Sequence, residues 1–158
     1  MKKYLVIVYS YHHNNTEKIA ETMADALACE MVHLNEKSYD DILDYDVVGF
    51  GAGIDSAKHY EPLLDFARKL HPVQNKKAFI FSTSAIISEK KIRKDHTALR
   101  EILLSKGYEI SGEFACKGYN TNSFLRYIGG MNKNHPDVND LQNTVVFADK
   151  LRNTISLD

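Results

Sequence analysis

The sequence predicts a doubly wound α/β sandwich, in which helices cover both faces of a parallel β-sheet. Short apolar runs without strict polar alternation recur along the chain, as expected for strands that are buried on both faces. Stretches with apolar residues every three or four positions lie between these runs and indicate amphipathic helices. The regular alternation of the two patterns is typical of βαβ units.

Five runs are expected to form the strands. The first, "YLVIVY", is almost continuously apolar, and the second is the weakest. The predicted strands are Tyr4–Tyr9, Glu30–Leu34, Asp46–Ala52, Lys77–Ser82 and Ile110–Cys116.

Four helical stretches accompany these strands. Ile19, Met23 and Leu27 form an apolar stripe after the first strand, and Pro62 suits the first turn of a second helix. A third helix is expected to end at Gly107, where glycine favours a C-terminal cap.

The last helix follows the fifth strand. Asn139 and Gln142 resemble a capping box that would open it.

Composition favours one globular domain over residues 1–158. The hydrophobic content is 44% and the formal net charge is -1, so no overall charge attracts nucleic acid. No apolar run reaches the roughly 20 residues that span a bilayer, and we expect a cytoplasmic protein. Cys29 and Cys116 have no metal-site spacing and are expected to be free thiols.

The segment "SYHHNNTEKIA", residues 10–20, joins the first strand to the first helix. Unpaired backbone N–H groups at a helix start attract anions, and Ser10 and Thr16 add hydroxyl donors. Asn14 or Asn15 would cap the helix, and plain capping is the alternative explanation for these residues. The glycines and lysine of a nucleoside triphosphate loop are absent. His12 and His13 lack the further ligands of a metal site, so none is predicted.

This segment resembles the phosphate-binding loop of flavodoxins, of the type (S/T)-x-T-G-x-T. The similarity continues in "FGAGIDSAKHYEPLLDFARKL", "KKAFIFSTSA" and "GEFACKGYNT", and it covers nearly the whole chain. The resemblance implies a flavodoxin-like three-layer sandwich with a five-stranded parallel sheet in the order 2-1-3-4-5 and helices on both faces. It also implies FMN as the cofactor. The implied phosphate ligands are Ser10, His12, Asn14, Asn15 and Thr16, with Asn14 standing where glycine is usual.

Three further loops at the carboxyl ends of strands would hold the flavin ring, where ligands of such sheets bind. By the resemblance these are the loops after the third, fourth and fifth strands, although an ordinary polar turn would look the same. The implied residues are Gly53, Ile54, Asp55, Thr83, Ser84, Ala85, Gly118, Tyr119 and Asn120.

Glycines of the third strand are expected to differ in role. Gly49 and Gly51 favour close packing within the strand. By the resemblance, the Gly53 peptide rotates when the flavin is reduced, and a plain turn glycine is the alternative. Since the chain has no Trp, the candidates for stacking on the ring are Tyr11, Tyr60 and Tyr119.

Two segments near the predicted site have open roles. The long stretch from Asn122 to Pro136 contains "FLRYIGGM", which would cover the ring, receive an apolar substrate or form a short core helix. The run "SEKKIRKDH" is either a solvated face or a docking patch for an acidic partner.

Three functions follow as hypotheses. The first is an FMN electron carrier without catalytic residues, acting as a monomer or homodimer on redox partner proteins or on a small acceptor such as a quinone. Because its charge is nearly balanced, we expect a less negative reduced-flavin potential than strongly acidic carriers have. The second is an FMN-dependent oxidoreductase, either a quinone reductase or an enzyme similar to flavodoxin-type protoporphyrinogen oxidases, which "GAGIDSAKHY" and "RYIGGM" also resemble. A phosphoacceptor receiver is excluded, because Tyr9-Ser10 and Ala52-Gly53 replace the carboxylates that would hold Mg²⁺.

Overall fold

The computed structural model describes residues 1–11, 13–119 and 128–157. Twelve elements follow one another along this part of the chain: β1 (Tyr4–Tyr9), α1 (Asn15–Leu27), β2 (Glu30–His33), α2 (Tyr39–Ile42), β3 (Val47–Asp55), β4 (Lys58–His59), α3 (Glu61–Arg68), β5 (Lys76–Ser84), α4 (Glu89–Asp95), α5 (Thr97–Ser105), β6 (Tyr108–Lys117) and α6 (Val138–Ser156).

The sheet has the order β2-β1-β3-β5-β6, and all neighbouring strands in this order are parallel. The short strand β4 pairs antiparallel with the end of β3 and lies off this path. Since β4 shifts the numbering by one, β5 and β6 are the fourth and fifth strands that the sequence predicts. The predicted order 2-1-3-4-5 is therefore confirmed.

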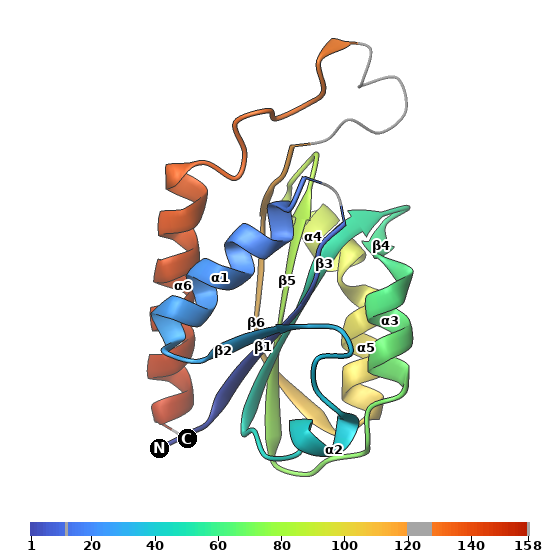
Figure 1. Cartoon of the computed structure of the whole chain (residues 1–158), viewed down its shortest axis with the longest axis vertical. Helices are drawn as coiled ribbons and strands as arrows, with labels where there is room; N and C mark the ends of the chain where they lie inside the picture. Colours follow the sequence, from blue (N-terminus) through green and yellow to red (C-terminus); the bar gives the residue numbers. More distant parts are fainter. Residues whose placement is uncertain (12, 120–127, 158) are drawn as a thin grey trace.

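Two helical layers cover the sheet. Helices α1 and α6 lie side by side on one face, and α3, α4 and α5 lie on the other (Figure 1). A separate apolar core fills each side: Val6, Ile19 and Phe79 belong to the first, and Leu5, Phe50 and Leu63 to the second. Alternate residues of one strand thus enter different cores, as a strand buried on both faces requires.

The glycines of β3 make room for two aromatic rings on the α1/α6 face. A Cβ atom at Gly49 would lie 2.2 Å from Phe79, and one at Gly51 would lie 2.0 Å from Phe81. The two phenylalanine rings stack with centroids 6.2 Å apart. The expected close packing at these glycines is confirmed.

Helix ends confirm three predictions and correct one. Gly107 has φ +92 and follows α5, as expected for a C-terminal glycine, and Pro62 lies in the first turn of α3. Asn14 occupies the predicted N-cap position of α1, although its side chain makes no cap bond. The capping box of α6 joins Asp137 and Asp140, so the prediction of Asn139 and Gln142 is wrong.

The two cysteines are free thiols, as expected. Within the described ranges, none of the helices combines the length and the apolar character that crossing a membrane demands.

Candidate functional site

A cavity of about 350 Å³, counting space open to solvent, lies at the carboxyl end of the sheet. The loops after β1, β3, β5 and β6 all contribute to its wall. The lining residues are Tyr11, Asn15, Thr16, Gly53, Ile54, Tyr60, Thr83, Ser84, Ala85, Gly118 and Tyr119.

The start of α1 forms the part of this wall that the sequence predicts to bind an anion. His13 and Asn14 precede the helix with φ values of 55 and 53, both in the left-handed region. Asn tolerates this region better than most residues, which explains why Asn14 serves where a glycine is usual. Ser10 Oγ accepts a hydrogen bond from the Glu17 N–H at 3.4 Å. A turn of this kind, followed by a helix of 13 residues, directs backbone N–H groups toward an anion.

Two buried side chains of α1 fasten the cavity walls to one another. Asn15 Nδ2 donates to the Tyr119 carbonyl at 2.7 Å, and the Thr16 hydroxyl hydrogen-bonds the Thr83 hydroxyl at 2.8 Å. Gly118 permits the first contact, because a Cβ there would lie 2.8 Å from Asn15 Nδ2. Loops that are far apart in sequence are therefore held together before any ligand binds.

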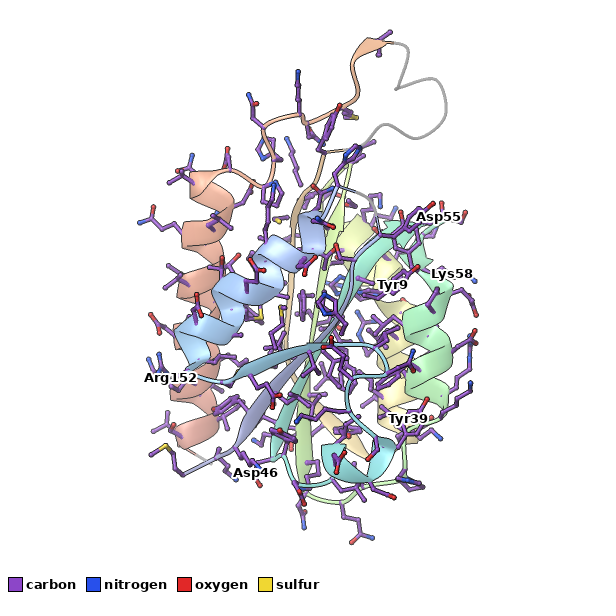
Figure 2. The ribbon with its side chains drawn as sticks, viewed as in Figure 1. Tyr9, Tyr39, Asp46, Asp55, Lys58 and Arg152 are labelled. Carbon is purple, nitrogen blue, oxygen red and sulfur yellow. The ribbon has the colours of Figure 1, made fainter. Side chains whose placement is uncertain are left out.

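A short hairpin forms the wall after β3. Ile54 pairs with His59, Asp55 pairs with Lys58, and the Tyr60 N–H donates to the Gly53 carbonyl at 3.0 Å. Figure 2 shows Asp55 and Lys58 together at the tip of this hairpin. The Gly53 peptide is thus part of the hairpin ladder, and its rotation would break this backbone hydrogen bond.

Aromatic rings stand on both sides of the cavity. Tyr60 lies against Tyr9 and Tyr11, with ring centroids 6.1 and 6.3 Å away. Opposite them, Tyr119 and His13 approach to 4.2 Å. The three tyrosines that were predicted as candidates for stacking, Tyr11, Tyr60 and Tyr119, all line the cavity. Tyr11 is the most accessible of them, with 72% of its surface exposed.

The segment from Ile128 to Pro136 is attached to the cavity rim. Asn132 Nδ2 donates to the Ala85 carbonyl at 2.6 Å, and the Tyr119 N–H donates to the His135 carbonyl at 3.0 Å. Ile128 is 69% exposed, so this residue does not belong to a core helix. Asn132 was not among the predicted site residues, although an Asn close behind two glycines ("GGMN") is a signal for the left-handed turn it forms (φ 57).

Most of the predicted site residues converge on this cavity. Three of them, Ser10, Asn14 and Asp55, are outside its lining. Ser10 Oγ accepts the hydrogen bond from Glu17 of α1, while Asn14 and Asp55 are exposed. His12 and Asn120 lie outside the described residues, as does the segment 121–127 with most of "FLRYIGGM".

The described lining contains no acidic, basic, histidine or cysteine side chain. The hydroxyl and amide side chains of this wall do not store electrons, so any redox chemistry must come from a bound cofactor. Among the described residues, His135, Asp137 and Asp140 form a cluster with metal-ligand spacing. Both carboxylates cap α6, and His135 Nδ1 lies 2.6 Å from Asp140 Oδ2, so helix capping accounts for this cluster.

Comparisons with known proteins agree with this arrangement. Residues 6–139 match the flavodoxin domain family. The chain is 45% identical over 146 residues to the uncharacterized protein MJ0298 of Methanocaldococcus jannaschii, which covers 92% of this chain and 95% of that protein.

Two solved structures share the fold. A flavodoxin from the domain Archaea superposes with a TM-score of 0.70 at 14% identity, covering 97% of this chain and 99% of its own. A flavodoxin of Streptococcus pneumoniae gives 0.69 at 16% identity, covering 96% and 99%. The family match, which spans most of the sequence, establishes that this chain belongs to the flavodoxin family of FMN-binding electron-transfer proteins.

Proposed function

We propose that this protein binds FMN in the cavity at the carboxyl end of its sheet and uses it to carry electrons between redox partners. The observation that carries the proposal is the uncharged cavity lining of small polar residues and tyrosines at the carboxyl end of the sheet. FMN takes up and returns one or two electrons, which is the chemistry that this wall cannot perform by itself.

Each part of the wall suits one part of FMN. The phosphate is assigned to the start of α1, whose N–H groups favour an anion, with Ser10, His12, Asn14, Asn15 and Thr16 as the proposed ligands. Because the Asn15 and Thr16 side chains already bind Tyr119 and Thr83, we assign their backbone N–H groups to the phosphate. The ring is assigned to the loops at Gly53–Asp55, Thr83–Ala85 and Gly118–Asn120.

The test compares FMN with riboflavin, which lacks the phosphate. The apoprotein is titrated with each flavin while flavin fluorescence is followed, and the visible spectrum of the purified protein is recorded. We expect saturable quenching by both flavins, with much tighter binding of FMN. Equal affinities would contradict the phosphate assignment, and no binding of either flavin would overturn the proposed function.

A substrate-specific oxidoreductase is the second candidate. The observation in its favour is the attached rim segment, in which the exposed Ile128 precedes Gly129, whose carbonyl accepts from the Tyr119 hydroxyl at 3.3 Å. This segment offers contact area for an apolar acceptor such as a quinone. Multiple turnovers with NAD(P)H and a soluble quinone would support this function. An electron carrier would instead be reduced only by a partner reductase or a chemical reductant.

A further inference from the structure

Two fully buried histidines lie behind the cavity without lining it. His59 belongs to β4 and His96 to the junction of α4 and α5, and neither exposes any surface. Their rings stand 4.9 Å apart and are tilted by 37°. A buried imidazole is costly unless its nitrogens find partners, so two adjacent ones call for a physical reason.

Each histidine binds β5 just before that strand reaches the cavity. His59 Nε2 lies 3.1 Å from the Phe81 carbonyl, and His96 Nε2 lies 2.7 Å from Ser82 Oγ. Since a carbonyl only accepts, the proton of His59 is on Nε2. The next residue along β5, Thr83, lines the cavity and holds Thr16 of α1.

His59 is also continuous with the opposite wall. It pairs with Ile54 across the hairpin and is followed by Tyr60, and both of these neighbours line the cavity. The imidazole therefore adds a side-chain tie between β4 and β5, beside the backbone pairing of β3 with β5 that ends at Gly53 and Thr83.

The hairpin needs such an anchor. β4 has two residues, and the turn residues Ser56 and Ala57 have φ values of 52 and 61, a region that side chains other than those of Asn and Asp rarely adopt. Its β3 arm belongs to the main sheet, but the β4 arm is held to β3 by two register pairs only. The contacts of His59 with Phe81 and His96 add tertiary support to this β4 arm.

We propose that His59, supported by His96, is a positioning residue that sets the placement of the Gly53–Tyr60 hairpin at the flavin ring. This inference rests on the proposed FMN function only where it concerns the ring. Anchoring His59 keeps the adjacent Tyr60 N–H on the Gly53 carbonyl, and so holds the Gly53 peptide in one orientation. Releasing the hairpin would free that carbonyl to accept a hydrogen bond from an N–H of reduced FMN, which would make the flavin easier to reduce.

Two substitutions separate the hydrogen bond from the volume of the ring. His59→Gln retains an N–H donor that can reach the Phe81 carbonyl, whereas His59→Leu fills the space without a donor. Leu151→Ala, at a buried position of α6 on the other face of the sheet, is the control for general destabilisation.

The first measurement is hydrogen exchange of residues 53–60 in the apoprotein, which does not depend on FMN. We expect about tenfold faster exchange in His59→Leu than in the wild type, with His59→Gln close to the wild type and Leu151→Ala unchanged in this segment relative to the rest of the sheet. If His59→Leu and Leu151→Ala accelerated exchange equally everywhere, the positioning role would be overturned even if FMN binds.

The second measurement is the midpoint potential of bound FMN, together with its visible circular dichroism. His59→Leu should shift the potential in the positive direction and change the dichroism of the ring, and His59→Gln should restore both. A wild-type potential in His59→Leu would overturn the effect on the ring. Failure of the wild-type protein to bind FMN would instead overturn the proposed function, and hydrogen exchange would still decide the role of His59 in the hairpin.

Discussion

The two faces of the sheet bury polar groups of different kinds. On the α1/α6 face these are neutral and paired: Thr16 with Thr83, Asn15 with the Tyr119 carbonyl, and Thr144 with the Asp140 carbonyl. On the face of α3, α4 and α5 they include three ionisable groups, and each of these retains a buried atom without a hydrogen-bond partner: His59 Nδ1, His96 Nδ1 and Asp95 Oδ1. On the first face, these buried polar side chains are paired and cost little stability. On the second face, the unpaired buried atoms lower the stability, but their side chains occupy fixed positions behind the cavity.

The charge network of the second face extends to its surface. His96 Nδ1 lies 3.7 Å from Glu113 Oε2, and Glu113 forms a two-pronged pair with Arg100 at 2.7 and 2.8 Å. Partial burial raises the pKa of Glu113, but its interactions with His96 and Arg100 outweigh this and lower the pKa to about 2. A fully buried histidine pair thus borders a carboxylate whose pKa is lowered, which makes this face the pH-sensitive one.

Truncation on the α1/α6 face should produce the largest effect. Phe81→Ala removes a fully buried ring that lies over Gly51, and glycine has no side chain to fill the space. We expect a loss of about 3–5 kcal/mol in the free energy of unfolding, measured by urea denaturation. The exposed Leu104→Ala should change it by less than about 0.5 kcal/mol. A loss below about 1 kcal/mol for Phe81→Ala would show that this face repacks.

Acid should weaken the other face next most strongly. Burial, and after it the proximity of His96, lower the pKa of His59 to about 3. At a pH below about 6.5, the usual pKa of histidine, His59 binds a proton in the unfolded chain but stays neutral in the folded chain. The free energy of unfolding therefore decreases as the pH falls from about 6.5 toward 3. Between pH 7.5 and 5.5 this single group should cost about 1.4 kcal/mol of unfolding free energy.

Urea denaturation across this pH range tests the contribution of His59. His59→Gln, which does not titrate, should flatten the pH dependence by that amount. An unchanged slope in the variant would assign the acid sensitivity to other groups. Below about pH 4.5, protonation of Glu113 in the unfolded chain should add a further loss, because its folded pKa is depressed.

Flavin affinity offers a test confined to the α1/α6 face. Thr16→Val removes one hydroxyl of the Thr16–Thr83 pair and leaves Thr83 without its buried partner. We expect FMN binding to weaken about tenfold, measured by fluorescence titration. Thr144→Val makes the same chemical change on α6, where the hydroxyl only bonds its own helix, and should leave the affinity unchanged. Equal losses in both variants would locate the effect in overall stability.

The smallest expected effect concerns α4, whose Lys90 and Lys94 are exposed. The helix begins four residues after Ala85 of the cavity lining, so a docking role for an acidic partner predicts faster electron transfer to anions. Replacing both lysines with Glu should slow reoxidation of the reduced protein by ferricyanide about two- to threefold at low salt, with the difference fading at high salt. The matched control replaces Lys69, at the C-terminal end of α3, and Lys150, on α6, with Glu. Both of these lysines lie farther from the cavity. If the control slowed reoxidation equally, α4 would have no docking role and its lysines would only form a solvated face.

Local patterns were enough to predict most of the architecture. The unbroken apolar strands and the helical stripes between them determine a doubly wound sheet, since only burial on both faces accommodates such strands. Short-range signals at Pro62 and Gly107 located helix ends correctly, because the favoured backbone angles of these residues depend on their own chemistry. The capping box of α6 was misplaced by two residues, since Asp137 and Asn139 are both good caps and only the path of the preceding segment selects between them.

By itself, the sequence determined the fold, the family resemblance and the set of loops that meet at the cavity. Tertiary structure alone decided which side chains line the cavity and which hold its walls together. For example, the Asn15 side chain donates to the Tyr119 carbonyl, and His59 is fully buried behind the hairpin. The reason is physical. Strand and helix patterns repeat over many residues and are fixed by burial, whereas one hydrogen bond between segments 104 residues apart depends on how all the layers pack.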